Sequence, residues 1–247
     1  MDFSDYPESG LYYGGSERKV SVNASGVEYM LKFRKRDEFG VRNNHISEYV
    51  GSHIFNLLGI EAQETFLGHY QDEEVVACRS FVRKNEQFVP FNGVGESTLE
   101  HDKEAYQYEY ADVMAMLRDN SKLTETNETI ALFWEMFVID ALLGNFDRHG
   151  SNWGFIKSAG RYRLAPVFDN GSCLYPRLVD EEEMKAVMLS REETDRRIFR
   201  FPTSQIKLNG QKSSYAEVIG SLKFPECNMA LAAVMERIDF GAIDDVI

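Results

Sequence analysis

The sequence predicts an α+β fold of two lobes, the first an antiparallel sheet with one helix and the second mainly helical. Up to about residue 90 the apolar residues mostly alternate with period two, whereas beyond it they recur at helical spacing over long segments. A chain of 247 residues can also bury roughly 70–75% of its unfolded surface without disulfides. We therefore place the lobes at residues 1–90 and 91–247.

Strand signals dominate the first lobe. Turn-forming residues 23–26 separate two alternating segments and predict a hairpin, and residues 46–58 have the apolar spacing of a helix that stops at Gly59. Four strands are expected in all, at about residues 20–22, 27–33, 64–70 and 74–82.

Helical spacing dominates the second lobe. A strongly apolar helix should end at Gly144, and a short strand pair should follow at residues 153–156 and 162–164. The expected helices lie at about residues 100–118, 128–143, 181–189, 215–222 and 228–238. The acidic run 180–183 fits a solvated helix start, which the helix dipole favours, better than a metal site.

Composition narrows the environment and the partners. The chain has 27 Lys and Arg against 40 Asp and Glu, and its net charge of -13 repels nucleic acid and anionic membranes. Neither a signal peptide nor a run of ~20 apolar residues is present, so no membrane association is expected. Three cysteines without paired spacing, Cys78, Cys173 and Cys227, favour a reducing cytoplasm.

The segment after the apolar helix carries the strongest chemical signal. Asp147 and Asn152 lie five residues apart. This spacing is similar to that of the protein-kinase catalytic loop, in which the Asp faces the substrate hydroxyl and the Asn binds metal. Asp169 follows a predicted strand and begins Asp-Asn-Gly, where a carboxylate can join phosphate oxygens through Mg²⁺. Either aspartate alone fits an ordinary turn, but together and in this order they favour phosphoryl transfer.

Positive charge for a triphosphate is available in the first lobe. Lys32 alternates with Leu31 and Phe33, so it should point into the cleft if those two face the core, and Glu48 on the following helix could hold it. Upstream, Gly14, Gly15 and Ser16 precede Lys19. A glycine-rich loop can bring its N–H groups close to phosphate oxygens, although this run also fits a plain turn.

His149 lies between the two loop residues but lacks partners at metal-ligand spacing. We expect it to act in catalysis by orienting the loop, through a hydrogen bond to the loop backbone or to Asp169. Trp153 and Phe155 should pack beneath the loop as alternate residues of a buried strand.

Residues 144–152 (Gly-Asn-Phe-Asp-Arg-His-Gly-Ser-Asn) and 164–170 (Leu-Ala-Pro-Val-Phe-Asp-Asn) resemble the HipA-like serine/threonine kinases of bacterial toxin–antitoxin systems. The resemblance implies a protein-kinase-like fold, ATP and Mg²⁺ as cofactors, and transfer to serine or threonine of a cytoplasmic protein. It implies Asp147 as catalytic base, Lys32 on the ATP phosphates, and Asn152 and Asp169 as Mg²⁺ ligands.

The resemblance extends more loosely to the glycine loop ending at Lys19 and to a hinge-like segment, residues 77–82, which places Arg79 and Phe81 at the nucleotide. Because the glycine loop begins within about fifteen residues of Met1, a compact form without the family's extra N-terminal subdomain is expected. An antitoxin partner is then one possibility beside the protein substrate.

Two other functions are compatible with these residues. The order Asp-Arg-His-x-x-Asn also resembles the catalytic loop of phosphatidylinositol kinases, although the acidity of the chain disfavours anionic membranes. A pseudokinase that binds nucleotide without turnover is the other alternative, although no expected catalytic position is missing.

Overall fold

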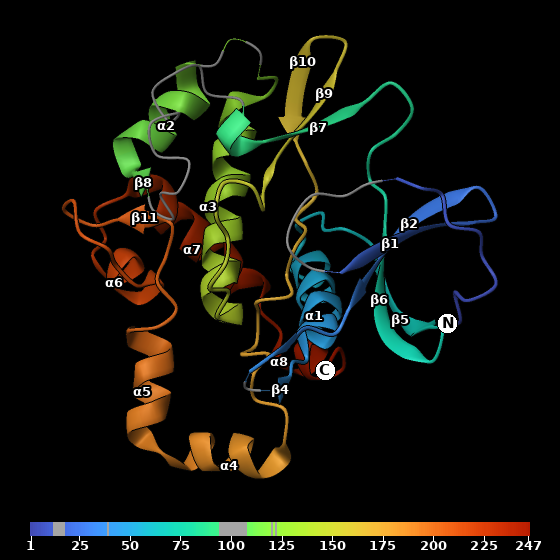
Figure 1. Ribbon diagram of the computed structural model, residues 1–247. Coiled ribbons are helices and arrows are strands. Elements are labelled where there is room, and N and C mark those ends of the chain that lie inside the picture. Colours follow the sequence, from blue (N-terminus) through green and yellow to red (C-terminus); the bar gives the residue numbers. More distant parts are fainter. Residues whose placement is uncertain (12–17, 39, 94–107, 120, 122) are drawn as a thin grey trace.

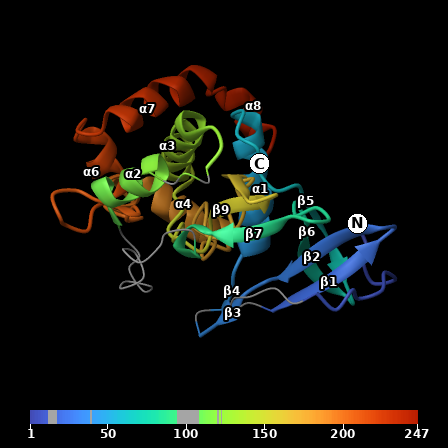
Figure 2. The same cartoon turned by 90° about the horizontal axis from the view of Figure 1, so that it is seen from above.

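The computed structural model describes residues 1–11, 18–38, 40–93, 108–119, 121 and 123–247. The α+β fold predicted from the sequence is confirmed (Figure 1). A four-stranded sheet and helix α1 (Asn44–Leu57) form one side of the molecule, and most of the helices form the other (Figure 2).

The sheet of the first lobe is antiparallel throughout. Its strand order is β1-β2-β6-β5, and the hairpin predicted at its start turns through Ser25 and Gly26, which both have positive φ. The four predicted strands are present as β1 (Lys19–Ala24), β2 (Val27–Phe33), β5 (Thr65–Tyr70) and β6 (Glu73–Arg79).

The two faces of this sheet bury different groups. Leu31 and Phe33 lie in a small apolar core that the N-terminal segment closes through Phe3, while Lys32 between them points to the other face, toward α1. A two-stranded ribbon, β3 (Arg36–Asp37) and β4 (Gly40–Val41), leads into α1. The helix begins two residues before its predicted start, and Gly59 follows its end with a positive φ of 79°.

The expected boundary at residue 90 falls at the end of an additional strand. Strand β7 (Gln87–Pro90) was not predicted, and it pairs with β9 (Gly154–Ser158) of the second lobe, as does β10 (Arg161–Leu164). A short 3-10 helix, η1 (Phe91–Gly93), follows. The segment that links the lobes is therefore residues 80–86, before β7.

Close packing between β7 and β9 leads to a stability prediction for Gly154. A Cβ at this position would lie 2.4 Å from the carbonyl oxygen of Val89 and 2.7 Å from the Cα of Pro90. We expect Gly154→Ala to lower the free energy of unfolding by about 1–3 kcal/mol, as overpacking does, in urea denaturation. Gly220→Ala is the control, because no atom lies within 4 Å of its Cβ. An equal effect of both substitutions would contradict the packing argument.

The second lobe is built around helix α3 (Thr126–Leu143), which the sequence predicted closely. It ends at Gly144, whose φ of 64° gives the left-handed conformation common at helix ends. Helices α2 (Tyr110–Asp119), α6 (Tyr215–Gly220) and α7 (Pro225–Arg237) pack against it, whereas α8 (Phe240–Asp244) lies beside α1. The core contains Phe133, Trp134 and Phe137 of α3, together with Trp153 and Phe155 beneath the following loop.

The helix predicted at residues 100–118 is only partly present. Residues 94–107 lie outside the described residues, and α2 begins at Tyr110. Residues Tyr108–Glu109 instead form strand β8, which pairs with β11 (Ile206–Lys207) in parallel. A local helical pattern cannot reveal such a pairing, because the partner strand lies almost a hundred residues later in the sequence.

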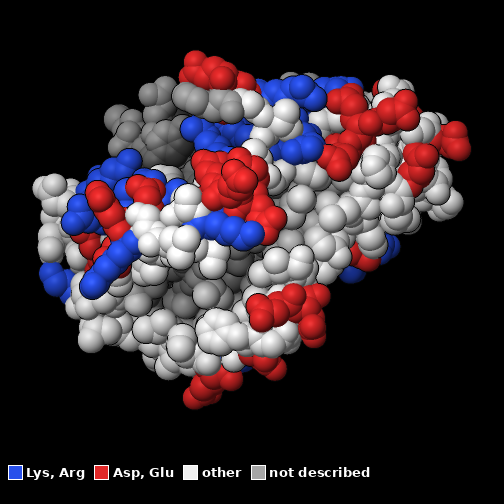
Figure 3. Space-filling model, turned by 90° about the horizontal axis from the view of Figure 1, so that it is seen from below, with Lys and Arg blue, Asp and Glu red and all other residues white. Residues whose placement is uncertain are grey.

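Helices α4 (Glu181–Leu189) and α5 (Arg191–Phe199) project from the second lobe, and neither has a buried residue (Figure 1). Asp180 caps α4 by accepting a hydrogen bond from the Glu183 N–H at 2.7 Å, so the acidic run is a solvated helix start. Figure 3 views the molecule from below and shows acidic and basic side chains interspersed on this face. Within the described residues, no helix is both long and apolar enough to span a membrane.

Candidate active site

A buried ion cluster joins the first lobe to the segment after β10. The Lys32 ammonium lies 2.9 Å from Oε2 of Glu48 on α1 and 2.9 Å from Oδ1 of Asp169. Lys32 and Glu48 are almost wholly buried, and the Asp169 side chain is 32% exposed. The strand alternation and helix position that predicted a Lys32–Glu48 pair therefore gave the right geometry.

Charge pairing outweighs burial in this cluster. Burial alone would raise the pKa of Asp169, but the adjacent Lys32 ammonium lowers it to about 2. Burial would likewise lower the pKa of Lys32, but Asp169 and Glu48 together hold it well above the ordinary lysine value. Both groups are therefore charged at neutral pH, as a site for a metal–phosphate complex needs.

The lowered pKa of Asp169 predicts a pH dependence of stability. A carboxylate with a folded pKa near 2, against ~3.9 unfolded, stabilises the fold above the unfolded value, and this contribution disappears as the pH falls toward 2. We expect the free energy of unfolding of the wild-type protein to exceed that of Asp169→Asn by about 1–2 kcal/mol near neutral pH, allowing for solvent screening. Urea denaturation should show the gap closing between about pH 5 and pH 2. A gap that stays constant would contradict the pairing.

A second lysine adjoins the cluster. Lys19 of β1 is directly opposite Lys32 of β2 in the antiparallel register, so the two side chains share one face. Its charge also helps to lower the pKa of Asp169. The predicted glycine-loop residues Gly14, Gly15 and Ser16 lie outside the described residues.

The loop after α3 is fixed from its helix end. The Asn145 side chain donates to the buried Asp140 carboxylate of α3 at 2.8 Å, and its amide oxygen accepts from the Asp147 N–H at 3.0 Å. Asn152 donates through its side-chain nitrogen to the Asp147 carbonyl at 2.8 Å. The main chain of Asp147 is thus held on both sides, while its carboxylate is 44% exposed.

Arg148 connects this loop to the Asp169 segment. Its guanidinium is fully buried and forms a two-pronged ion pair with Asp140, at 2.8 and 2.9 Å. It also donates to the carbonyl of Asn152 at 3.0 Å, to the carbonyl of Phe168, and to the Asn170 side chain at 2.6 Å. One side chain therefore positions Asn152 and both neighbours of Asp169.

Neither Asp140 nor Arg148 was among the predicted functional residues. Asp140 gave a signal that could have been used, because it is an isolated carboxylate on a strongly apolar helix, and a buried charge requires a partner. For Arg148 the only signal in the sequence was its position between Asp147 and His149.

His149 has the orienting geometry expected of it. Its Nδ1 accepts from the Ser151 N–H at 3.2 Å, which closes the loop on itself, and its Nε2 lies 3.7 Å from Oδ1 of Asp147. Of the two alternatives considered for the ring, the structure shows the bond to the loop backbone.

A small hollow of about 20 Å³ adjoins Asp147. Its second wall is the segment after α5, whose Phe201 ring stacks on Phe146 with centroids 5.8 Å apart. The hollow is lined by Phe146, Asp147, Arg148, His149, Thr203, Ser204, Gln205 and Tyr215. An acceptor side chain could reach Asp147 at this opening.

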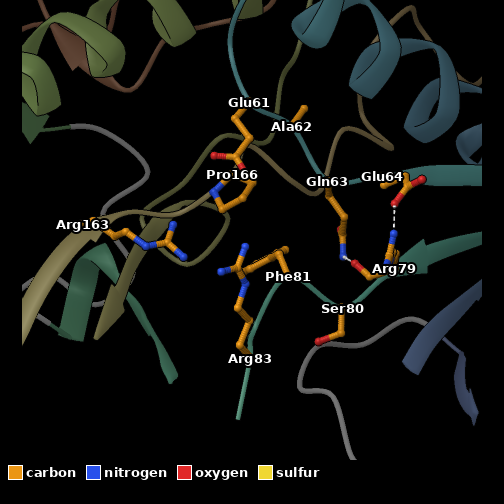
Figure 4. A pocket seen from close by; sticks show the side chains of 10 residues that line it. All are labelled: Glu61, Ala62, Gln63, Glu64, Arg79, Ser80, Phe81, Arg83, Arg163 and Pro166. Atoms are coloured by element: carbon orange, nitrogen blue, oxygen red, sulfur yellow. Dashed lines mark hydrogen bonds and ion pairs between the residues drawn. The ribbon is translucent and has the colours of Figure 1, made fainter. Parts of the chain in front are cut away.

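The side chains of Phe81, in the segment linking the lobes, and of Arg79, at the end of β6, point to different surroundings. Phe81 packs against Phe168, the residue before Asp169, with ring centroids 5.5 Å apart. Arg79 points away from Lys32, since its guanidinium pairs with Glu64 at 2.7 Å and its backbone bonds toward β5. Both residues line a pocket on the β5 side of this segment, separate from the ion cluster (Figure 4).

Comparison with known proteins gives consistent matches. A family model described as the HipA-like C-terminal domain matches residues 11–232. The serine/threonine-protein kinase CtkA of Helicobacter pylori is 36% identical over 248 residues, which cover 98% of this chain and 75% of that protein. The crystal structure of a H. pylori proinflammatory kinase CtkA has a TM-score of 0.89 at 34% identity, covering 100% of this chain and 86% of that chain.

A more distant structure, HipA of Shewanella oneidensis MR-1 with HipB and operator DNA, gives a TM-score of 0.44 at 13% identity. It covers 98% of this chain and 69% of that chain. At this level of similarity it supports no inference about partners.

Proposed function

Because the chain belongs to the HipA-like C-terminal domain family and is a serine/threonine kinase, we propose that it transfers the γ-phosphate of ATP to a protein hydroxyl, with Mg²⁺ bound between its lobes. The observation that supports this most is the ion cluster of Lys32, Glu48 and Asp169. It joins Lys32 to Asp169, which is 137 positions later in the sequence. If Asp169 were only a turn residue, it would not require this buried ion pair.

In this proposal Lys32 holds the phosphates and Glu48 holds Lys32. Lys19, on the same face of the hairpin, adds positive charge, and Gly14, Gly15 and Ser16 would cover the phosphates. Phe81 offers an apolar surface for the base beside Phe168. Arg79 is left out of the proposed nucleotide site because its side chain and backbone are engaged on the β5 side.

The residues present fit Mg²⁺. This cation needs only one or two protein oxygens when phosphate oxygens and water complete its shell. Asp169 supplies a carboxylate that is ionised at neutral pH. The Asn152 amide donates to the loop through its nitrogen, so its oxygen would be the second ligand. Among the described residues no cluster of three or more acidic, His or Cys side chains could hold a metal alone, which fits a metal held jointly with nucleotide. When bound, Mg²⁺ would neutralise charge on the phosphates.

The acceptor hydroxyl would enter the hollow beside Asp147, which would accept its proton or orient it. His149 would help to hold the Asp147 loop in shape. We further propose a cytoplasmic protein substrate, since all three cysteines are free and buried. An antitoxin partner remains a proposal carried by the family resemblance alone.

The test is transfer of labelled phosphate. Purified protein with γ-labelled ATP, Mg²⁺ and a cell lysate should label phosphoserine or phosphothreonine in a protein band, and chelation of Mg²⁺ should abolish the label. Lys32→Met should label at least a hundredfold less, since electrostatic stabilisation of the phosphates is lost. Labelling of phosphoinositide vesicles in place of protein, or equal labelling by Lys32→Met, would overturn the proposal.

A further inference from the structure

The pocket beside the segment linking the lobes has about 350 Å³ of space, within the range of small-molecule sites. Three stretches of chain line it: residues 61–64 just before β5, residues 79–83, and residues 163–166 in and after β10. It therefore spans both lobes. None of the ion-cluster residues lines it, and in the sheet order β1-β2-β6-β5 it lies on the β5 side of β6 while Lys32 lies in β2.

One buried oxygen atom in this pocket has no hydrogen-bond partner among the described residues. Gln63 is only 5% exposed, and its side-chain nitrogen donates to the carbonyl of Arg79 at 2.9 Å. That bond fixes the amide, yet in the part of the chain that the structure describes no donor bonds to its oxygen Oε1. Because an unsatisfied buried acceptor costs about 1–3 kcal/mol, the site calls for a ligand that brings an N–H or O–H donor.

Charged side chains of both signs surround this acceptor. Figure 4 shows the guanidinium groups of Arg83 and Arg163 on one side of the opening, with the carboxylate of Glu61 on another. Arg163 has a loose ion pair with Glu86 at 3.4 Å, whereas Arg79 and Glu64 form a closer ion pair at 2.7 Å. No hydrogen bond within the described residues engages the side chains of Arg83 and Glu61.

We propose that this pocket binds a small zwitterion of the α-amino acid class. Its carboxylate would lie between the guanidinium groups of Arg83 and Arg163, a charge-assisted contact. Its ammonium would donate to Oε1 of Gln63 and face the Glu61 carboxylate. A carboxylate alone would leave Oε1 of Gln63 without a donor, and a cation alone would face two guanidinium groups. A ligand that carries both charges meets both requirements.

Binding can be tested without reference to catalysis. Each of the twenty L-amino acids is added to the full chain in excess, and thermal unfolding and isothermal titration calorimetry report binding, because a ligand that binds only the folded state raises its stability. At least one amino acid is expected to bind, while acetate and methylamine, as probes of each charge alone, should bind at least about tenfold more weakly. If no amino acid binds, or if acetate alone binds as tightly, the proposal is overturned.

Substitutions locate the site. Arg83→Ala and Gln63→Met should each lower the affinity for the amino acid that binds by at least about tenfold, because each removes one charge-assisted hydrogen bond. Arg161→Ala is the matched control, since Arg161 is an exposed arginine of the same strand as Arg163 but does not line the pocket. Arg83 is exposed, so its variant should fold even if Gln63→Met does not. Undiminished binding by Arg83→Ala would place the ligand elsewhere and refute the assignment.

Discussion

Replacing Asp147 by asparagine is expected to lower the rate of phosphoryl transfer about thousandfold while leaving nucleotide affinity within about twofold. General acid–base groups contribute roughly 10²–10⁴-fold to rate, and Asp147 is the carboxylate at the acceptor hollow. It takes no part in the ion cluster of Lys32, Glu48 and Asp169. The substitution should therefore separate transfer from nucleotide binding.

The loop should keep its shape in this variant. Its hydrogen bonds to Asn145 and Asn152 use the main-chain N–H and C=O of Asp147, which asparagine also has. Single-turnover kinetics would measure transfer, and calorimetry with ATP and Mg²⁺ would measure affinity. Asp112→Asn, an exposed aspartate on α2, is the control and should match wild type. A rate within about threefold of wild type would remove Asp147 from the role of base.

The parts of the site that the sequence predicted are those with a local signature. The alternation of residues along β2 predicted the face to which Lys32 points, and helical spacing predicted α1 and therefore the position of Glu48. A glycine after an apolar helix gave the end of α3. In each case the pattern depends on residues that are close together in the sequence, so it can be recognised without knowledge of the fold.

The parts that escaped prediction depend on distant partners. Strand β7 is stabilised by β9, whose paired residues lie 64 to 70 positions later, and β8 is stabilised by β11. Helix α5 has no apolar stripe to detect, because it buries no residue. The expected nucleotide role of Arg79 rested on its place in the hinge-like segment, which does not reveal that its side chain turns to Glu64.

Arg148→Met is expected to destabilise the protein by about 3–5 kcal/mol, because it leaves the carboxylate of Asp140 buried without its partner. Phosphoryl transfer should also fall at least a hundredfold at temperatures where the variant remains folded, since misplacement of catalytic groups by about 1 Å can have that effect. Urea denaturation and single-turnover kinetics would measure the two effects. Arg163→Met, which breaks an exposed ion pair with Glu86, is the control and should cost under about 1 kcal/mol.

The two effects of Arg148 should separate in a double variant. Adding Asp140→Leu removes the unpaired charge, so at least about 2 kcal/mol of stability should return, although Asn145 loses one hydrogen bond. Transfer should stay low, because the guanidinium contacts to the carbonyls of Asn152 and Phe168 are still missing. These contacts set the positions of the two proposed metal ligands. The Asp140 carboxylate serves only to neutralise the buried guanidinium that makes them. Recovery of transfer together with stability would show that the ligands hold their places without Arg148.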